Sequence, residues 1–474
     1  MKFIILFLSL TLLMGGASGL RLNQITPSDY DVLNHIIDNV TLTNATMESD
    51  GIDWTSGIGA KLTNVTNGTA AQDGVPYSQV SAIVKNATTY GGIVRYKSPY
   101  FYAFEADGSI VCRSTNLSYT ANALVRSLRT YRASWLYDCY YDIVLDVGNA
   151  SMSEGSIWLC RGIHFTAPTG TTLNVATNIP IFRSNSTELN DDVEIDGFIL
   201  KHNGAGNYSS AHILLQNGSN SDIHHNKMYQ LSTPFATTNR GGIKLVGGFT
   251  NGHSWLHHIH HNEVPCLEIY YTSDSYFYYN TFASYGSNAY SLYWNEYGNI
   301  FLGFNHITIT QHASTVTFGL YLDGGNQWTS TVFRNRFEPQ GSWTEGDQFA
   351  VWVASGNITS CVFAENVMED LGGNAFNMGS GGYLSQIIGN IVHRYNRAEN
   401  ANYRAISTGG NGFWQCTVSG NKIDKPDGSN TGTAIYISAG RYNQITNNNV
   451  VGQITTGLTI PAGNTDTGNY FIST

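Results

Sequence analysis

Short stretches in which apolar and polar residues alternate recur from about residue 193 to the end of the chain. Their first residues lie 23 to 31 residues apart, and each stretch ends in small or polar residues. Alternation with a period of two predicts β-strands, whereas helical repeats need runs of about ten residues with a 3.6-residue period. The repeat therefore predicts a parallel β-solenoid whose coils stack ~4.8 Å apart. The stretches begin ILLQNG (213), IKLVGG (243), LEIYYT (267), LYWNEY (292), LYLDGG (320), VWVASG (351), FNMGSG (376), ISTGGN (406), IYISAG (435) and LTIPAG (458).

A second strand in each coil ends in an asparagine, followed by any residue and then an apolar one. Asparagine side chains that stack in register hydrogen-bond along the stack and stabilise turns. The motif therefore predicts one ladder of asparagines along the solenoid. Its members are Asn226, Asn262, Asn280, Asn305, Asn335, Asn366, Asn390, Asn421, Asn449 and Asn469.

The asparagine ladder and the strand starts, over roughly residues 193–474, resemble the right-handed parallel β-helix superfamily of pectate lyases, polygalacturonases and phage tailspikes. The order of the segments is also similar to that of secreted archaeal β-helix repeat proteins. The resemblance implies an all-β, right-handed parallel β-helix of about 11 or more coils, with an N-terminal capping helix and a small N-terminal module. It does not imply one activity, because this fold carries enzymes, binding proteins and structural spikes.

The region upstream of the repeat divides into three segments. Residues 1–19, MKFIILFLSLTLLMGGASG, have the charged start, apolar core and small-residue end of a secretory signal peptide. Residues 20–90 are rich in sequons and are interpreted as an attachment or cap module. Residues 91–192 form the lead-in to the solenoid, with a hairpin pair and an amphipathic capping helix over 120–132. The parallel β-helix then occupies 193–474.

Composition and charge point to the outside of the cell. Only 12% of residues are charged, the net charge is −10, and no lysine or arginine cluster suggests a nucleic-acid partner. After the signal peptide no segment is apolar enough to span a membrane. We expect a secreted or cell-surface glycoprotein, if the host glycosylates. Eleven N-x-S/T sequons are present, at Asn39, Asn44, Asn64, Asn67, Asn86, Asn116, Asn149, Asn185, Asn207, Asn217 and Asn357.

Strand alternation predicts an outward aromatic surface on consecutive coils. Tyr293, Tyr321 and Trp352 take the first outward position of their strands, with Tyr270 and Asn295 in the neighbouring column. Aromatic rings have flat apolar faces and polar edges, which suits the apolar and polar sides of sugar rings. We expect these residues to bind an extracellular polysaccharide, as in an adhesin, an envelope protein or a spike. The sequence leaves open association into a trimer or a surface array.

Cleavage of the polysaccharide is the alternative, with Glu268, Asp323 and Lys244 as candidate catalytic residues. Glycoside hydrolysis needs two carboxyl groups on opposite sides of the bond, and a lyase needs a base and a group that neutralises a uronate. The motifs of polygalacturonases are not present in their order. No cofactor is certain; Ca²⁺ is the one considered, although the acidic side chains on this face are few.

The stretch WLHHIHHNEV places four histidines within residues 257–261. The repeat separates them into different columns, because Asn262 belongs to the ladder and Ile259 points inward. What remains is a set of side chains on two adjacent coils that suits a divalent ion, although a solvated polar surface is the simpler interpretation. Its members are Asp222, His224, His258 and His260.

The six cysteines contain no closely spaced pair of the kind that zinc cages use. Cys361 and Cys416 each lie five residues before a ladder asparagine, two coils apart. Two coil rises separate their Cα atoms by about 9.6 Å, beyond the ~7 Å limit for a disulfide. We therefore expect two buried free thiols. One pair among Cys112, Cys139 and Cys160 is compatible with a disulfide.

Overall fold

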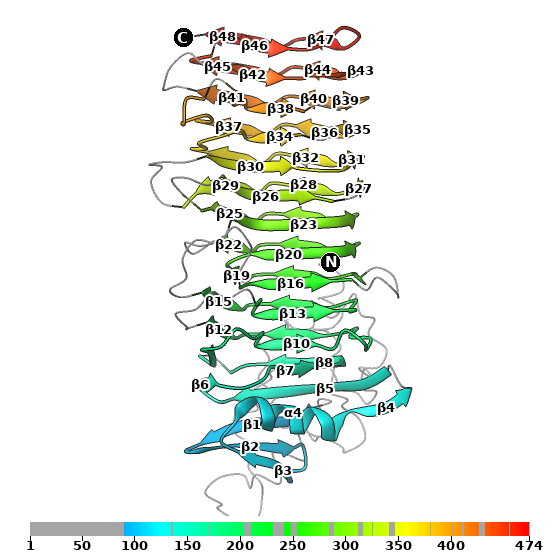
Figure 1. The fold of residues 1–474 in the computed structure, drawn as a ribbon, viewed down its shortest axis with the longest axis vertical. Helices are drawn as coiled ribbons and strands as arrows, with labels where there is room; N and C mark the ends of the chain where they lie inside the picture. The colour runs from blue at the N-terminus through cyan, green and yellow to red at the C-terminus, as the bar shows by residue number, and fades with distance from the viewer. Residues whose placement is uncertain are drawn as a thin grey trace, which may run out of the picture. The chain divides into compact units, whose positions relative to one another are not determined.

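A computed structural model describes residues 90–473, apart from residues 134–135, 169, 203–209, 231–240, 248–253, 284–288, 311–315, 325, 341–346, 380, 401, 410–411, 426–431 and 455. The described part is a long stack of parallel strands with one α-helix near its N-terminal end (Figure 1). The predicted signal peptide and nearly all of the predicted module at 20–90 lie outside it, so both stay predictions. No helix in this part of the chain is long and apolar enough to cross a membrane.

The lead-in contains the predicted hairpins and helix. β1 (Tyr90–Lys97) pairs antiparallel with β2 (Tyr100–Glu105), and β2 pairs antiparallel with β3 (Ile110–Ser114). Helix α4 (Leu117–Leu128) begins three residues before the predicted start at 120 and ends before 132. It begins there because the Asn116 side chain accepts a hydrogen bond from Tyr119 N and caps the first turn. β4 (Thr130–Ala133) and β5 (Leu136–Asp146) follow.

Helix α4 is held against the first solenoid strands. Asn122 Nδ2 donates to Ser156 O at 2.8 Å, and Trp158 N donates to Asn122 Oδ1 at 2.8 Å. Leu124 and Val125 are buried on the same side of the helix. The predicted apolar face of the helix is therefore the one that packs.

Each solenoid turn contributes strands to three parallel sheets, here named C, A and B in chain order. Sheet C holds β7 (Ile157–Leu159), β10 (Phe182–Ser184), β13 (Ile213–Gln216), β16 (Ile243–Val246), β20 (Leu267–Ser273), β23 (Tyr290–Gly298), β26 (Thr317–Asp323), β30 (Gln348–Val353), β34 (Phe376–Met378), β38 (Ile406–Thr408), β42 (Thr433–Tyr436) and β46 (Thr456–Thr459). Short second strands extend it, namely β17 (Ser254–Trp255), β27 (Asn326–Trp328), β31 (Asn357–Thr359), β35 (Gly382–Tyr383), β39 (Phe413–Trp414) and β43 (Gly440–Arg441).

Sheets A and B complete the turns. Sheet A continues from β5 through β8 (Arg161–Thr166), β11 (Glu194–Asp196), β14 (Asp222–His224), β18 (His258–His260), β21 (Tyr276–Tyr278), β24 (Phe301–Gly303), β28 (Thr331–Phe333), β32 (Val362–Ala364), β36 (Gln386–Ile388), β40 (Thr417–Ser419), β44 (Gln444–Thr446) and β47 (Thr465–Thr467). Sheet B has 13 strands, β6 (Asn149–Met152), β9 (Thr172–Val175), β12 (Ile199–His202), β15 (Lys227–Gln230), β19 (Glu263–Val264), β22 (Thr281–Ala283), β25 (His306–Ile309), β29 (Arg336–Pro339), β33 (Val367–Glu369), β37 (Ile391–His393), β41 (Lys422–Lys425), β45 (Asn449–Gly452) and β48 (Tyr470–Ser473). This is an all-β parallel solenoid of the right-handed type.

The apolar positions of the repeat form a continuous core. Ile213, Ile243, Leu267, Leu292 and Leu320 lie in register on successive strands of sheet C and are fully buried. Burying one such side chain contributes ~1.5–3 kcal/mol. The alternation seen in the sequence is thus the division between this core and the outer surface.

The predicted asparagine ladder runs along the corner between sheets A and B. Each ladder asparagine donates from Nδ2 to Oδ1 of the next one at 2.8 to 3.2 Å. The same Oδ1 accepts the backbone N–H of the previous asparagine at 2.9 to 3.1 Å. Both polar ends of every internal amide are therefore satisfied in the core.

One predicted member of the ladder is wrong. Asn448 makes the ladder bonds and is 1% exposed, whereas Asn449 begins β45 and faces outward. The residue before each ladder asparagine has a left-handed φ of 51° to 67°, and at this turn it is Asn447. Because residues 447–449 are all asparagine, the sequence alone did not show which of them belongs to the ladder.

The ladder makes nine turns between Asn226 and Asn469, fewer than the predicted count of about 11 or more coils. The turn before Asn226 has strands in all three sheets, but Phe198 occupies the ladder position. The regular repeat is thus shorter than the stack of strands.

The corner between sheets C and A has the same design. A left-handed residue precedes an inward residue there, as with Leu384 before Ser385 and Tyr442 before Asn443. The inward side chains accept backbone N–H groups of the previous turn, as Ser385 Oγ does from Cys361 N at 3.2 Å. The sequence predicted the ladder at the corner between sheets A and B but not the one between sheets C and A.

Cys361 and Cys416 occupy this second ladder and are buried free thiols, as predicted. Burial raises the pKa of each thiol to about 11. Cys112, Cys139 and Cys160 are also free. The disulfide considered among them is not formed in the structure, although a side-chain hydrogen bond joins Cys139 and Cys160 and raises the pKa of Cys160.

Replacing a ladder asparagine is expected to destabilise the solenoid. Asn448→Ala removes the acceptor of the buried Asn421 N and Nδ2 groups and one donor to Asn469 Oδ1. A buried polar group left unpaired costs about 1–3 kcal/mol, so the melting temperature falls by several degrees. The neighbouring Asn449→Ala is the matched control and changes stability by less than about 0.5 kcal/mol. Thermal unfolding followed by circular dichroism measures both, and equal melting temperatures would show that the ladder does not stabilise the fold.

Candidate functional site

The outward residues predicted on sheet C lie in two columns that the strand pairing fixes. Lys244, Glu268, Tyr293, Tyr321 and Trp352 occupy equivalent positions on β16, β20, β23, β26 and β30. The second column contains Tyr270, Asn295 and Asp323 in register. The structure therefore brings all eight predicted side chains onto one face.

Aromatic contacts continue across this face from turn to turn. Tyr270 and Tyr293 have ring centroids 5.5 Å apart, and Tyr293 stacks on Tyr321 at 5.8 Å with 14° between the planes. Phe318 lies 4.7 Å from Tyr321 and 5.4 Å from Trp352. We call Tyr270, Tyr290, Tyr293, Tyr321 and Trp352 the aromatic face; Tyr290 and the supporting Phe318 were not among the predicted residues.

Glu268 is tied to two neighbours on the same face. Its carboxylate lies 2.8 Å from Lys244 Nζ and accepts a hydrogen bond from Tyr270 OH at 3.2 Å. The Lys244 ammonium also lies 4.6 Å from the centroid of the Tyr270 ring, a cation–π distance. Glu268 is 8% exposed, so its charge is compensated inside the face.

Asp323 is held by a separate set of donors. Tyr293 OH donates to one carboxylate oxygen at 3.0 Å, while Ser355 Oγ and Gly324 N donate to the other at 2.7 and 2.9 Å. Asn295 Nδ2 donates to Tyr293 OH at 3.4 Å. Glu268 and Asp323 are thus each bound to a tyrosine hydroxyl, and those two tyrosines are ring neighbours.

Burial keeps the tyrosine phenol groups of the aromatic face protonated. Desolvation raises the pKa of Tyr293 and of Tyr321 to about 12, and it also raises the pKa of Tyr270 and Tyr290. The four phenols are therefore neutral near pH 7 and act as hydrogen-bond donors and acceptors. Such a surface is suited to recognising hydroxyl groups.

A long turn adds one more aromatic ring. Tyr403 packs edge-on against Phe349 at 5.2 Å, and its hydroxyl donates to Asp347. Phe349 in turn lies 4.7 Å from Trp352. Tyr403 therefore places this turn beside the aromatic face, while Arg397 of the same turn lies 2.8 Å from Asp370.

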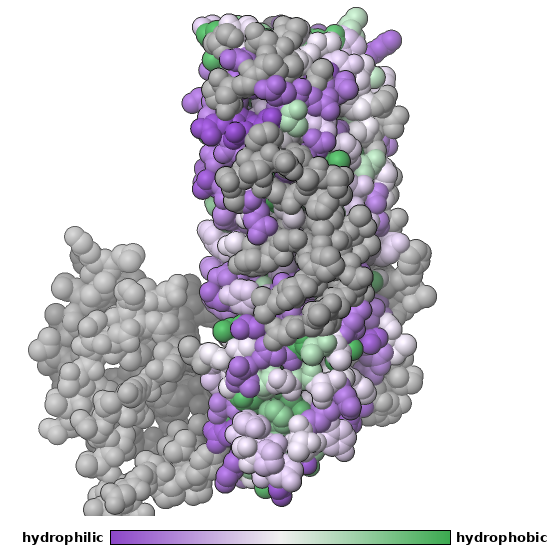
Figure 2. Space-filling model, turned by 60° about the vertical axis from the view of Figure 1, so that its left-hand side comes forward, coloured by the Kyte–Doolittle hydropathy of each residue, from purple (hydrophilic) through white to green (hydrophobic). Residues whose placement is uncertain are grey.

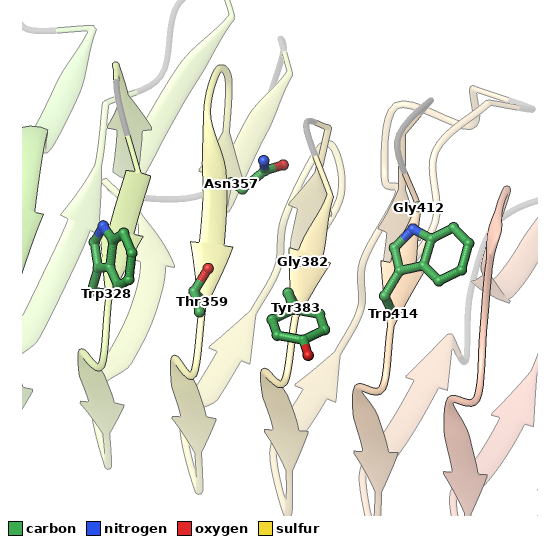
Figure 3. A pocket seen from close by; sticks show the side chains of 7 residues that line it. All are labelled: Trp328, Asn357, Thr359, Gly382, Tyr383, Gly412 and Trp414. Carbon is green, nitrogen blue, oxygen red and sulfur yellow. The ribbon is translucent and has the colours of Figure 1, made fainter.

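A second aromatic surface, which the sequence reading missed, follows the short second strands of sheet C. The residues just before the left-handed corner lie in register on consecutive turns, and we call them the tryptophan column. Trp328, Tyr383 and Trp414 are 53%, 44% and 44% exposed, and the small side chain of Thr359 separates the first two (Figure 3). They line a shallow pocket of about 400 Å³. The column contains Trp255, Ser273, Gly298, Trp328, Thr359, Tyr383, Trp414 and Arg441.

The strands that carry the tryptophan column are too short for the sequence to show an alternating pattern. Each aromatic residue of the column ends a strand of only two or three residues, as Trp414 does in Phe413–Trp414. A two-residue strand shows no alternation, so its orientation became visible only once the corner was placed.

The histidines of residues 257–261 separate as expected. His258 packs on Tyr276 at 5.1 Å, and His260 Nε2 lies 3.0 Å from Asp222 Oδ1. His260 stacks on His224 of the turn below at 5.0 Å. The metal set predicted from Asp222, His224, His258 and His260 does not converge, because His258 turns to Tyr276 while His260 and His224 present parallel rings.

One face of the solenoid exposes mainly polar residues (Figure 2). Figure 2 shows one face of the described part, which is mainly hydrophilic, with hydrophobic residues gathered toward its lower, N-terminal end. A surface of this kind is compatible with contacts to hydrated ligands.

Comparison with known proteins gives a likeness of fold. No protein-family model and no curated protein matches the chain. Among solved structures it is similar to the Dettilon tailspike protein gp208, with 13% identity and a TM-score of 0.48 over 76% of this chain and 65% of that one. It is similar to the A-module of the Azotobacter vinelandii mannuronan C-5 epimerase AlgE6, with 11% identity and a TM-score of 0.45 over 76% and 95% of the chains.

A third similar structure is the periplasmic alginate epimerase AlgG, with 11% identity and a TM-score of 0.42 over 74% of this chain and 82% of that one. The chain spans about two thirds of the length of the tailspike, 65%. Likeness at these levels concerns the fold alone. The class that the strands define is the parallel β-helix, as the sequence predicted.

His257 is expected to make the fold sensitive to acid. It is fully buried, and desolvation lowers its pKa to about 3, against ~6.5 in an unfolded chain. Below pH 6.5 the unfolded state binds a proton that the folded state does not, so stability falls as the pH drops from 6.5 toward 3, by up to ~1.4 kcal/mol per pH unit.

The measurement is the melting temperature between pH 8 and pH 4 in the wild type and in His257→Gln. The variant should show a shallower decline below pH 6.5, whatever its absolute stability. An identical slope in both proteins would show that His257 does not contribute.

Proposed function

We propose that this protein binds a polysaccharide along the aromatic face of sheet C. The observation that carries the proposal is the unbroken series of ring contacts from Tyr270 to Trp352, over strands of four consecutive turns. An extended chain of sugar rings repeats along its length as the solenoid does, so each turn offers a ring to a neighbouring sugar. The neutral phenols, Asn295 and the Lys244–Glu268 pair supply hydrogen bonds to sugar hydroxyls.

The solved structures similar in fold include a tailspike protein, an alginate epimerase and a mannuronan C-5 epimerase. For this chain the signal peptide pattern and the sequons support a secreted or cell-surface location. Its biological role is then that of an adhesin, an envelope protein or a spike.

Removing one ring from the aromatic face should weaken polysaccharide binding. Titration calorimetry against soluble neutral glucans, alginate and pectate is expected to find a ligand whose Kd rises at least tenfold in Tyr321→Ala, about 1.4 kcal/mol. Tyr276→Ala is the matched control, because Tyr276 is 44% exposed but belongs to sheet A. It should leave the Kd unchanged.

Trp414→Ala tests the rival surface. Loss of binding in this variant together with unchanged binding in Tyr321→Ala would assign the polysaccharide to the tryptophan column and contradict the proposal. Absence of binding to every polysaccharide in the panel would also contradict it.

Cleavage of the bound polysaccharide is the second candidate function. The observation that favours it is that Glu268 and Asp323 lie on the same face, each hydrogen-bonded to a tyrosine hydroxyl. A lyase or a hydrolase would use these carboxyl groups with Lys244.

Product analysis separates the two functions. If the protein is an enzyme, the wild type releases oligosaccharides, and Glu268→Gln or Asp323→Asn lowers the rate at least 100-fold while the Kd changes little. Binding without release of products from any polysaccharide would reject the enzymatic function and leave the binding function intact.

A further inference from the structure

The corner between sheets A and B brings three metal-ligating atoms together one turn below the predicted histidine set. His224 Nδ1 lies 3.0 Å from Asp196 Oδ1 and 2.9 Å from His225 Nδ1, and His225 Nδ1 lies 3.4 Å from Asp196 Oδ1. Within the described residues, this is the group of three His, Cys, Asp or Glu side chains whose ligand atoms converge in this way.

The backbone explains why two consecutive residues point at the same place. His225 is the left-handed residue before Asn226, with φ of 52°. Its ring consequently stands edge-on to that of His224, with centroids 5.0 Å apart and 86° between the planes. Asp196 ends β11 directly beneath His224, the end of β14, so the strand register supplies the third ligand.

The distances match those around a bound ion. Ligand atoms 2.0–2.2 Å from a tetrahedral zinc ion lie about 3.3–3.6 Å from one another, and the three distances here, 2.9 to 3.4 Å, are close to that range. Two imidazoles and one carboxylate suit zinc and the neighbouring first-row divalent ions.

In the neutral form of His224, hydrogen bonds leave part of the cluster unsatisfied. His224 Nε2 lies 3.0 Å from Glu194 Oε1, so the proton of a neutral His224 sits on Nε2 and its Nδ1 presents a lone pair. That lone pair faces the Asp196 carboxylate and His225, and the single proton on His225 serves only one of these contacts. A divalent ion in place of a proton on His224 Nδ1 would contact all three atoms.

The outer partners also have the arrangement found around metal-bound histidines. A carboxylate on the far nitrogen fixes the tautomer and orientation of a metal-bound imidazole, and Glu194 does this for His224. Glu194 Oε1 is itself 3.0 Å from His164 Nε2, and His164 Nδ1 is 3.0 Å from Asp142 Oδ1. His224 is thus held by residues of three successive turns.

The next turn has a second histidine pair, His260 and His261, but no carboxylate in the position that Asp196 occupies beneath His224. His260 Nδ1 and His261 Nδ1 are 2.9 Å apart, and His260 Nε2 lies 3.0 Å from Asp222. The residue beneath His260, in the position that Asp196 has beneath His224, is His224 itself. We propose that Asp196, His224 and His225 bind one divalent transition-metal ion, with zinc as the expected ion, and that His260 and His261 do not form an equivalent site.

The side chain of His225 is 60% exposed, so the site opens to solvent and leaves room for water or an exogenous ligand. The site belongs to sheet A, whereas the aromatic face belongs to sheet C. The metal proposal therefore stands whether or not the protein binds a polysaccharide.

The test is titration of the purified full-length protein, stripped with chelator, with ZnCl₂ and CoCl₂ at pH 7.5. We expect one equivalent to bind, a cobalt absorption spectrum of a four- or five-coordinate site, and a higher melting temperature with zinc. His225→Ala should raise the Kd for zinc at least 100-fold and abolish the thermal shift, while circular dichroism shows an unchanged fold because the side chain is exposed.

Two further variants make the result decisive. His258→Ala, which removes a histidine from the neighbouring strand without touching the proposed ligands, should bind zinc as the wild type does. The proposal is overturned if the wild type binds no zinc or cobalt, if His225→Ala keeps the wild-type Kd, or if His261→Ala and not His225→Ala abolishes binding.

Discussion

The hydrogen-bonded ladder of buried asparagines is the constraint on which the rest of the solenoid depends. Each turn of the chain bends at this corner and points an asparagine side chain into the core, where an unpaired amide costs about 1–3 kcal/mol. The left-handed residue at each corner adds a conformational cost of roughly 1–2 kcal/mol when it is not glycine. Because each asparagine bonds to the turn above and the turn below, for example Asn335 to both Asn366 and Leu302 O, the ladder offsets both costs. The strand register, and with it every outward column, follows from this corner.

The corners of the solenoid also carry several of the candidate functional side chains. The residue just before the left-handed position lies at the end of a strand and faces outward. At the corner between sheets C and A this position gives the tryptophan column, and at the corner between sheets A and B it gives Asp196, His224 and His260. The aromatic face lies on the flat part of sheet C instead. Two of the three surfaces therefore use one backbone pattern, and their character depends on which side chains the turns present.

Much of the fold was predictable because individual residues in each turn, such as the ladder asparagine, mark the repeat in the sequence. The alternating strands, the ladder and the outward positions of Tyr293, Tyr321 and Trp352 all follow from a period of two and one asparagine per turn. Asn449 was assigned in place of Asn448 because the sequence cannot show which of three consecutive asparagines points inward. The left-handed φ of Asn447 identifies Asn448 as the inward residue. The tryptophan column was missed because strands of two residues carry no period.

The candidate sites were less predictable for a different reason. Strand register placed Glu268 and Asp323 on one face, but their partners, Lys244, Tyr293 and Ser355, depend on rotamers that a sequence does not specify. The candidate metal set Asp222, His224, His258 and His260 was chosen from outward strand positions on two adjacent coils. The ligands that converge include His225, a corner residue, and the direction of its side chain depends on a left-handed φ that strand alternation does not describe.

The two-residue corner has an evolutionary consequence. A left-handed residue followed by a buried polar one fixes the path of the chain and leaves the preceding side chain with little part in folding. From β14 to β44 that position holds two histidines, then tyrosine, glycine, phenylalanine, alanine, isoleucine, serine and threonine on successive turns of sheet A. Selection can therefore change the surface of one turn at a time, and a duplicated turn brings with it a new place to display a ligand or a ring without redesign of the interior.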